Sequence, residues 1–111
     1  MNAWMLLAAA IVLEICATSL LKASAGFTRP LYGIGSIALY TLCFWLLAFA
    51  FTRIPVGVAY AIWSGVGIVG IALIGVFLFR QPLTLSQIGF MALVGIGAVG
   101  LSLVTPAQAM H

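Results

Sequence analysis

Four long apolar stretches, separated by short polar breaks, dominate the pattern of this 111-residue chain. They run over residues 3–21, 31–52, 55–79 and 84–104, and each is close to the ~20 residues that a membrane-spanning helix needs. Their apolar residues are continuous rather than alternating, which favours helices over the strands of a barrel. The pattern therefore predicts an all-α membrane protein in which residues 1–111 form one domain of four transmembrane helices.

The three breaks contain turn-forming residues and basic side chains. They extend from Lys22 to Pro30, from Thr52 to Pro55 and from Phe79 to Pro82, and each ends in a proline, which suits the first turn of a new helix. Such short connections make neighbouring helices antiparallel, and an even number of spans puts both chain ends on one side. A cleaved signal peptide is not expected in the first stretch, because it lacks a basic beginning and contains an acid.

Composition supports lipid as the solvent of this chain. Hydrophobic residues make up 66% of it and charged residues only 5%, whereas about a quarter of an ordinary soluble chain is charged. Five charged residues are too few to cover the surface of a small soluble domain. We therefore expect a multi-pass membrane protein.

The basic residues lie at the junctions between the apolar stretches. Lys22, Arg29 and Arg80 belong to the first and third connections, and Arg53 belongs to the second. An excess of basic residues favours the cytoplasmic side, so the first and third connections are predicted to be cytoplasmic. The bias amounts to two charges, which leaves insertion in both orientations open. Binding of nucleic acid is not expected, because the basic residues are scattered rather than clustered.

The remaining chemistry is sparse. Cys16 and Cys43 both lie in apolar stretches, without metal-ligand spacing, and are interpreted as small hydrophobic residues. The single histidine is the terminal His111. We expect no disulfide, no metal site, no cofactor and no enzymatic activity.

Glu14 is the one acid in the chain, and it lies inside the first apolar stretch. At 1.5 Å per residue it is about 16 Å deep in the helix, near the bilayer midplane, where a charged side chain costs ~2.5–3.5 kcal/mol or more. Lys22 is about 12 Å away along the axis, so no internal salt bridge is expected. The carboxyl should therefore take up a proton or an external cation. The alternative is a structural carboxyl that forms a hydrogen bond with another helix.

Small residues surround Glu14 on its predicted helix face. Leu7, Ala10, Ala17 and Thr18 lie at helical spacing from it. The two alanines would leave space for a ligand beside the carboxyl, or would allow another helix to pack closely. Thr18 is placed to form a hydrogen bond with the carboxyl or with its own helix.

The third stretch carries an aromatic stripe. One helix face carries Tyr60, Trp63, Ser64 and Gly67. Two aromatic rings on one face suit a bulky cation. An interfacial aromatic belt is the alternative, but Trp63 is about nine residues inside its helix. Gly65 and Gly67 weaken this helix and could allow it to bend.

The second stretch adds a further pair of aromatic residues. Tyr40 and Phe44 are four residues apart and would extend the same wall, or would face the core or the lipid. The fourth stretch is rich in glycine and is interpreted as a packing helix. Because four helices make a thin wall, a central chamber is expected to need two copies of the chain.

These residues together resemble the small multidrug resistance family of proton-coupled exporters, across nearly the whole chain. The resemblance rests on the following runs: Leu13-Glu14-Ile15, Leu21-Lys22, Gly26-Phe27-Thr28-Arg29, Ile54-Pro55, Ala59-Tyr60-Ala61-Ile62-Trp63-Ser64-Gly65-Val66-Gly67 and Gln81-Pro82-Leu83. A lone intramembrane acid is a weak indication, but its combination with the Ala-Tyr-Ala-Ile-Trp run at this chain length is specific.

The resemblance implies an antiparallel homodimer in the bacterial inner membrane, with Glu14 of both subunits as the shared site for protons and organic cations. It implies that Tyr60, Trp63 and Tyr40 contact the substrate, and that the segment from Gly65 to Gly67 is a conformational hinge. It also implies that the fourth helix forms the dimer contact, with Gly97 at an expected glycine. Phe90 stands where another glycine is often found in the family.

The family has branches with different substrates. Guanidinium exporters usually carry a tryptophan at the position of Ala17, and the pair Ala17 and Thr18 resembles the quaternary-ammonium branch. The predicted function is therefore proton-coupled export of hydrophobic and quaternary ammonium cations. The alternatives are a guanidinium exporter, a polyamine exporter that works as an unlike pair, a passive cation channel, and a membrane assembly subunit without transport activity.

Overall fold

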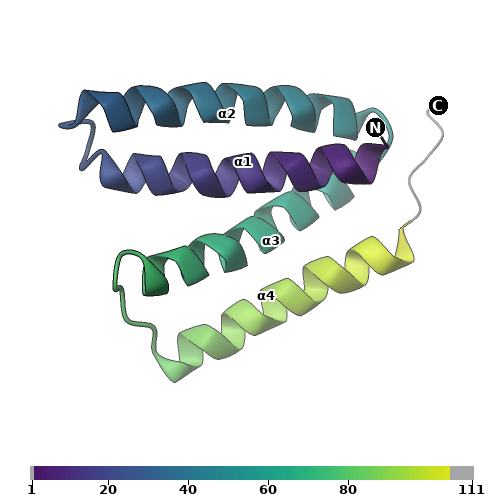
Figure 1. Ribbon diagram of the computed structural model, residues 1–111. Coiled ribbons are helices and arrows are strands. Elements are labelled where there is room, and N and C mark those ends of the chain that lie inside the picture. Colours follow the sequence, from purple (N-terminus) through teal and green to yellow (C-terminus); the bar gives the residue numbers. More distant parts are fainter. Residues whose placement is uncertain (1, 106–111) are drawn as a thin grey trace.

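Four helices make up the computed structural model, which describes residues 2–105. They are α1 (Ala3–Ala23), α2 (Pro30–Phe51), α3 (Val56–Phe77) and α4 (Leu85–Val104) (Figure 1). All four are long and apolar enough to cross a membrane. The predicted fold class is confirmed, and the observed helix bounds differ from the predicted ranges by no more than two residues.

Local chemistry explains where α1 and α4 begin. The Asn2 side chain accepts a hydrogen bond from the backbone N–H of Met5 at 2.9 Å. At α4, Thr84 and Gln87 form a reciprocal capping box, in which each side chain accepts a bond from the backbone of the other. Both arrangements satisfy N–H groups that have no partner within the helix.

Proline has a different place at each of the three connections. Pro30 occupies the first turn of α2, as predicted, and Pro55 is the N-cap of α3. Pro82 instead lies in the connection before α4, two residues ahead of the N-cap Thr84. It precedes the helix, in agreement with the predicted start at residue 84, because the capping box of Thr84 sets that start.

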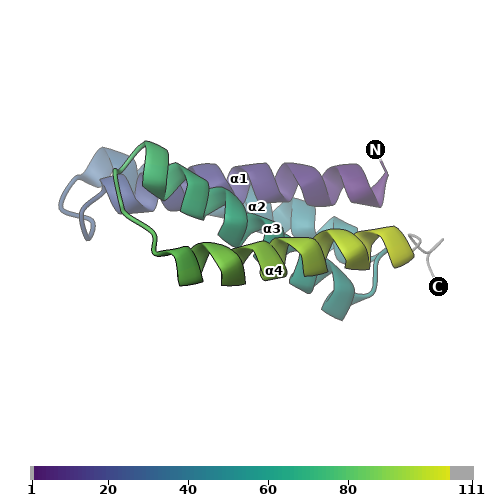
Figure 2. The ribbon, with the colours of Figure 1, turned by 90° about the horizontal axis from the view of Figure 1, so that it is seen from below.

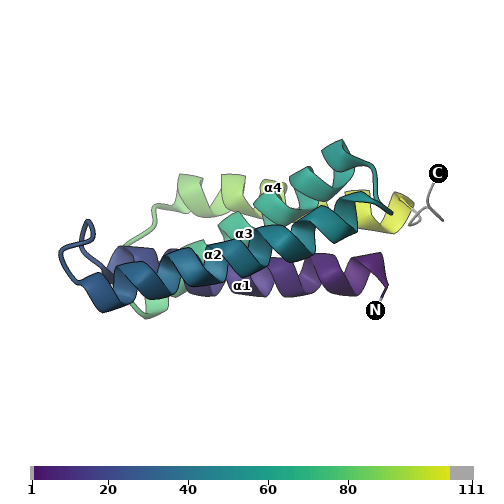
Figure 3. The same cartoon turned by 90° about the horizontal axis from the view of Figure 1, so that it is seen from above.

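The helices form successive layers. α1 and α2 pack as an antiparallel pair, α3 crosses beside α1, and α4 packs on α3 alone among the described helices (Figure 1). Views from opposite sides show α4 nearest to the viewer in Figure 2 and behind the other helices in Figure 3. The core consequently sits between α1, α2 and α3.

Two polar side chains of α2 fasten it to α1. The Ser36 hydroxyl donates to the carbonyl of Ala17 at 2.8 Å, and the Cys43 thiol donates to the carbonyl of Ala10 at 3.2 Å. Both acceptors belong to alanines, whose small side chains let the two backbones approach closely. Because α2 packs on the side of α1 that carries Ala10 and Ala17, the side that carries Glu14 faces α3.

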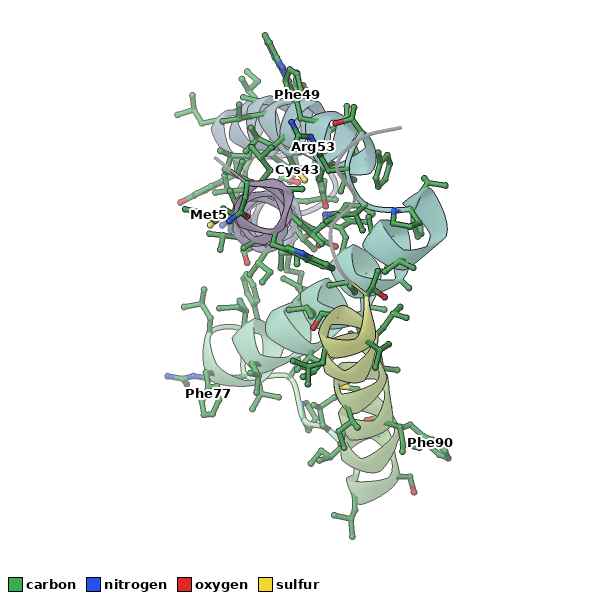
Figure 4. All side chains as sticks on the ribbon, turned by 90° about the vertical axis from the view of Figure 1, so that its right-hand side faces the viewer. Met5, Cys43, Phe49, Arg53, Phe77 and Phe90 are labelled. Atoms are coloured by element: carbon green, nitrogen blue, oxygen red, sulfur yellow. The ribbon has the colours of Figure 1, made fainter. Side chains whose placement is uncertain are left out.

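Large apolar side chains cover the outside of the molecule. Phe49, Phe77 and Phe90 point away from the bundle in the end view of Figure 4, and Ala98 is the one buried residue of α4. In water such a surface would aggregate, whereas in a bilayer it faces lipid or another helix.

The basic residues separate between the two ends of the bundle. Lys22, Arg29 and Arg80 lie at the end that holds the α1–α2 and α3–α4 connections, and Arg53 lies at the other end, where α1 begins and α4 ends (Figure 1). This distribution is the one that the sequence predicted for a four-span chain.

Candidate functional site

The Glu14 side chain of α1 is directed at α3, and Gly67 provides the room for it. Glu14 is the twelfth residue of α1 (Ala3–Ala23), and Gly67 is the twelfth of α3 (Val56–Phe77). A Cβ atom added to Gly67 would overlap the carboxyl carbon and both carboxyl oxygens of Glu14. The acid therefore lies halfway along the helices, in direct contact with the α3 backbone.

Two polar side-chain atoms, one on α1 and one on α3, are buried without a hydrogen-bond partner among residues 2–105. They are Oε2 of Glu14 and the indole Nε1 of Trp63. A buried polar group without a partner is unfavourable by roughly 1–3 kcal/mol. The carboxylate oxygen can be satisfied by a proton or a cation, and the indole N–H can be satisfied by an acceptor oxygen.

Cys43 of α2 belongs to the same cluster. Its thiol is fully buried, faces the side chain of Trp63 and lies within electrostatic range of Glu14, and it points into the bundle in Figure 4. The sequence interpretation treated this residue only as a small hydrophobe. Its position three residues after Tyr40, on the same helix face, was the available indication that it belongs to the site.

Four aromatic rings from α2 and α3 form one continuous surface, the aromatic wall. Tyr40 stacks on Phe44 with a centroid distance of 6.1 Å and an interplanar angle of 16°. Phe44 contacts Trp63 at 5.9 Å and 58°, and Trp63 meets Tyr60 edge-on at 5.5 Å and 70°. The structure thus brings together the two aromatic pairs that the sequence placed on separate helices.

Thr18 connects this wall to α1. Its hydroxyl forms a hydrogen bond with the hydroxyl of Tyr40, and it lies one helical turn after Glu14. Thr18 therefore positions Tyr40 rather than Glu14. Ser64, next to Trp63 on α3, is half-buried.

Parts of the aromatic wall are open in the single chain. Tyr60 is 57% exposed and Phe44 is 52% exposed, whereas Trp63 is half-buried at the centre. A ring face accepts a cation best when water is kept away. One chain therefore leaves part of the aromatic wall uncovered.

The small residues predicted to border the site lie instead in the packing around α1. Leu7 is 1% exposed, and Ala10 and Ala17 are fully buried. The hydrogen bonds from α2 end on the carbonyls of these alanines. This arrangement favours the close-packing interpretation of the three residues, and their contact with a substrate stays a prediction.

The glycines of α3 have separate neighbours. A Cβ at Gly65 would lie 3.0 Å from the Ala98 Cβ of α4, and a Cβ at Gly70 would run into Ile15 of α1. Gly65 thus allows α4 to approach, while Gly67 accommodates the acid. α3 is a continuous helix in this conformation, so a hinge at these glycines stays a prediction.

The outer face of α4 carries the predicted dimer glycine. A Cβ at Gly97 would meet no heavy atom within 4 Å, and Phe90 is 69% exposed.

Among residues 2–105 no group of three or more His, Cys, Asp or Glu side chains is placed to hold a metal ion. The chemistry available is therefore that of one carboxyl, one thiol, hydroxyls and aromatic rings.

Comparison with known proteins points to one family. Residues 2–94 match the family model described as Small Multidrug Resistance protein. The chain is 45% identical over 105 residues to the multidrug transporter EmrE of Escherichia coli strain K12, covering 95% of this chain and 96% of that protein. It is 42% identical over 109 residues to the quaternary ammonium compound-resistance protein QacE of Escherichia coli, covering 98% and 99% of the two chains.

A relative with another substrate is also similar along most of its length. The guanidinium exporter of Yersinia pseudotuberculosis is 37% identical over 101 residues, which cover 91% of this chain and 97% of that protein. EmrE and QacE are thus more similar to this chain than this guanidinium exporter is.

Proposed function

Because this chain belongs to the small multidrug resistance family, a family of efflux transporters in the bacterial inner membrane, we propose that it exchanges protons for hydrophobic and quaternary ammonium cations at Glu14. The observation that carries the proposal is the buried, unpartnered Oε2 of Glu14, which lies against Gly67 halfway along the helices, one helical turn after Trp63 on α3. A negative charge at this depth attracts a cation that can leave water, and the aromatic wall suits its apolar groups.

Competition for one carboxyl couples the two ligands. A deprotonated Glu14 binds the organic cation, and protonation of the same group removes the charge that holds it. If the protein changes its open side only when loaded, export of the cation is tied to entry of protons. The linkage needs no second acid, which agrees with the presence of one Asp or Glu in the chain.

Two copies of the chain complete the proposed site. Tyr60 and Phe44 are more than half exposed in one chain, and a second copy would enclose a cation between two aromatic walls. The open face of α4 around Gly97 is the proposed contact. The family resemblance implies that the copies are antiparallel, and the small charge bias between the two ends is compatible with insertion in both orientations. The two Glu14 carboxyls would then titrate as a coupled pair.

The side chains near Trp63 and at position 17 indicate the class of substrate. A compact guanidinium group needs a fork of polar acceptors, whereas the rings that pack against Trp63 are those of Tyr60 and Phe44. At position 17, where guanidinium exporters usually carry tryptophan, Ala17 is fully buried against α2. These features favour a bulky, apolar cation over guanidinium.

The proposed function is tested by binding of tetraphenylphosphonium to the detergent-solubilised protein at several pH values. Affinity should rise with pH until the carboxyls are deprotonated and then stay constant. Binding that is absent, or that does not change with pH, would favour a membrane assembly subunit. Transport in vesicles that never saturates would favour a passive channel.

The aromatic wall gives a prediction for substrate affinity. Trp63→Ala should weaken tetraphenylphosphonium binding about tenfold, because a desolvated cation–ring contact is worth roughly 1–2 kcal/mol. Isothermal titration at a pH where Glu14 is deprotonated measures the effect. Trp45→Ala is the matched control, because Trp45 is 63% exposed on α2 and should leave affinity unchanged. Equal affinities of the two variants would remove Trp63 from the site.

A second prediction concerns charge movement. If two carboxyls must be protonated to release one drug, export of a monovalent cation moves one net positive charge inward, and export of a divalent cation moves none. Each charge is worth ~2.3 kcal/mol per 100 mV. The test uses reconstituted vesicles without a pH gradient, in which potassium sets an inside-negative potential. This potential should drive uphill export of monovalent drugs only. Equal driving of monovalent and divalent drugs would contradict the two-carboxyl count.

A further inference from the structure

An apolar groove lies between α3 and α4, away from Glu14. It encloses about 670 Å³, and all of its lining residues are apolar. Small residues form its floor, namely Ala72 on α3 with Ala92, Gly95 and Gly100 on α4. The groove exists because these positions lack large side chains where the two helices run side by side (Figure 1).

The groove is longer than the depth of one bilayer leaflet. Its lining on α4 extends from Ile88 to Leu103, which corresponds to about 22 Å at 1.5 Å per residue. The hydrocarbon core of a bilayer is ≈ 30 Å thick, so the tails of one leaflet reach about 15 Å deep. The groove is therefore long enough to take the acyl chain of a lipid in either leaflet.

One end of the groove lies at the α3–α4 connection, which carries an exposed arginine. Leu83 lines this end, and Arg80 is three residues earlier in the same connection, exposed and with a positive φ of 54°. Glu14 is the single Asp or Glu in the sequence, and it lies in the middle of α1. Arg80 thus has no side-chain carboxylate to pair with at its end of the bundle, whereas lipid phosphates are abundant there.

The groove and the open face of α4 are on opposite sides of that helix. At about 100° per residue, Ile88, Ala92 and Val99 cluster on one side, and Phe90 and Gly97 lie roughly half a turn away. Figure 4 shows Phe90 pointing away from α3. A second copy of the chain that packs on the Gly97 face consequently leaves the groove open to the bilayer.

We propose that the α3–α4 groove binds an anionic phospholipid, with one acyl chain lying along the small residues of the groove and the phosphate paired with Arg80. The site does not depend on the transport activity proposed above. It accounts for both the apolar hollow and the unpaired cation at its end, which neither the cation site nor the α4 contact uses.

Native mass spectrometry of the full chain, purified with equal amounts of phosphatidylglycerol and phosphatidylcholine, tests the proposal. Wild-type protein should retain phosphatidylglycerol with a roughly fivefold preference, because one basic residue attracts its net negative headgroup by about 1 kcal/mol, whereas the phosphate of phosphatidylcholine is neutralised by its own choline group. Arg80→Gln should remove the preference. Arg53→Gln, which removes a charge at the opposite end of the bundle, should keep it.

Filling the groove tests the acyl-chain part. Ala92→Phe on α4 and Ala72→Leu on α3 should each lower retention of both lipids. Ala38→Phe, at an exposed position of α2, should not. Helix content by circular dichroism identifies any variant that does not fold, and the two filling positions keep the test decisive if one fails.

Two results would overturn the proposal. The first is an equal loss of preference in Arg80→Gln and Arg53→Gln, which would indicate general surface charge. The second is unchanged lipid retention in both filled variants. If these variants also lose subunit association, the groove is a contact between copies of the chain.

Discussion

Replacing Glu14 by glutamine is expected to abolish proton-driven efflux and the pH dependence of cation binding, while membrane insertion and helix content stay intact. Glutamine has nearly the same shape but carries no charge, and no other Asp or Glu exists in the chain to replace it. A pair of unit charges 4 Å apart is worth about 4 kcal/mol at an effective dielectric constant of 20. Affinity for tetraphenylphosphonium should therefore fall about a thousandfold.

The shorter acid provides the matched control for this prediction. Glu14→Asp keeps the charge but withdraws it by one methylene, so the variant should retain part of the binding with an altered pH dependence. Equilibrium binding across pH and uptake into vesicles with an imposed pH gradient measure the two variants. Proton-driven efflux that persists in Glu14→Gln would show that another group carries the protons.

The fold and the central acid could be predicted from the sequence because both depend on local properties. Continuous apolar stretches of about 20 residues leave a chain in lipid with few alternatives to helices. An acid inside such a stretch can be recognised from the sequence alone, because placing a charged side chain in the membrane is unfavourable. The place of Glu14 in the middle of α1 follows directly from counting.

The neighbours of Glu14 could not be predicted in the same way, because they depend on how the helices rotate against one another. Ala10 and Ala17 lie at helical spacing from the acid, but hydrogen bonds from Cys43 and Ser36 turn them toward α2. Thr18 likewise meets Tyr40 rather than the carboxyl. Spacing along one helix gives the residues of a face, but not the helix that the face meets.

Gly67 is a second residue whose neighbours could not be predicted from spacing along one helix. In the sequence it lies on the aromatic stripe of α3, and it was interpreted as a point where the helix could bend. The structure gives it a more specific task, since the carboxyl of Glu14 occupies the space that a side chain at position 67 would need. Flexibility and close approach are separate reasons for glycine, and they lead to different predictions.

Gly67→Ala is expected to weaken cation binding by about tenfold to a hundredfold and to stop transport, with little loss of folding stability. The added methyl group overlaps the end of the Glu14 side chain, which can rotate away, so the damage falls on the position of the carboxylate. Overpacking typically costs 1–3 kcal/mol, and here that energy is lost from cation binding.

Two glycines of the same helix provide controls. At Gly57 an added Cβ meets no atom within 4 Å, so Gly57→Ala should bind and transport as wild type and corrects for the higher helix propensity of alanine. Gly65→Ala contacts Ala98 of α4 instead of Glu14, so it should affect conformational exchange more than affinity. Binding of tetraphenylphosphonium across pH and vesicle transport should be measured for all three variants. If Gly67→Ala binds as tightly as Gly57→Ala, the carboxylate does not act from its place against α3, and the hinge interpretation of Gly67 is left as the better one.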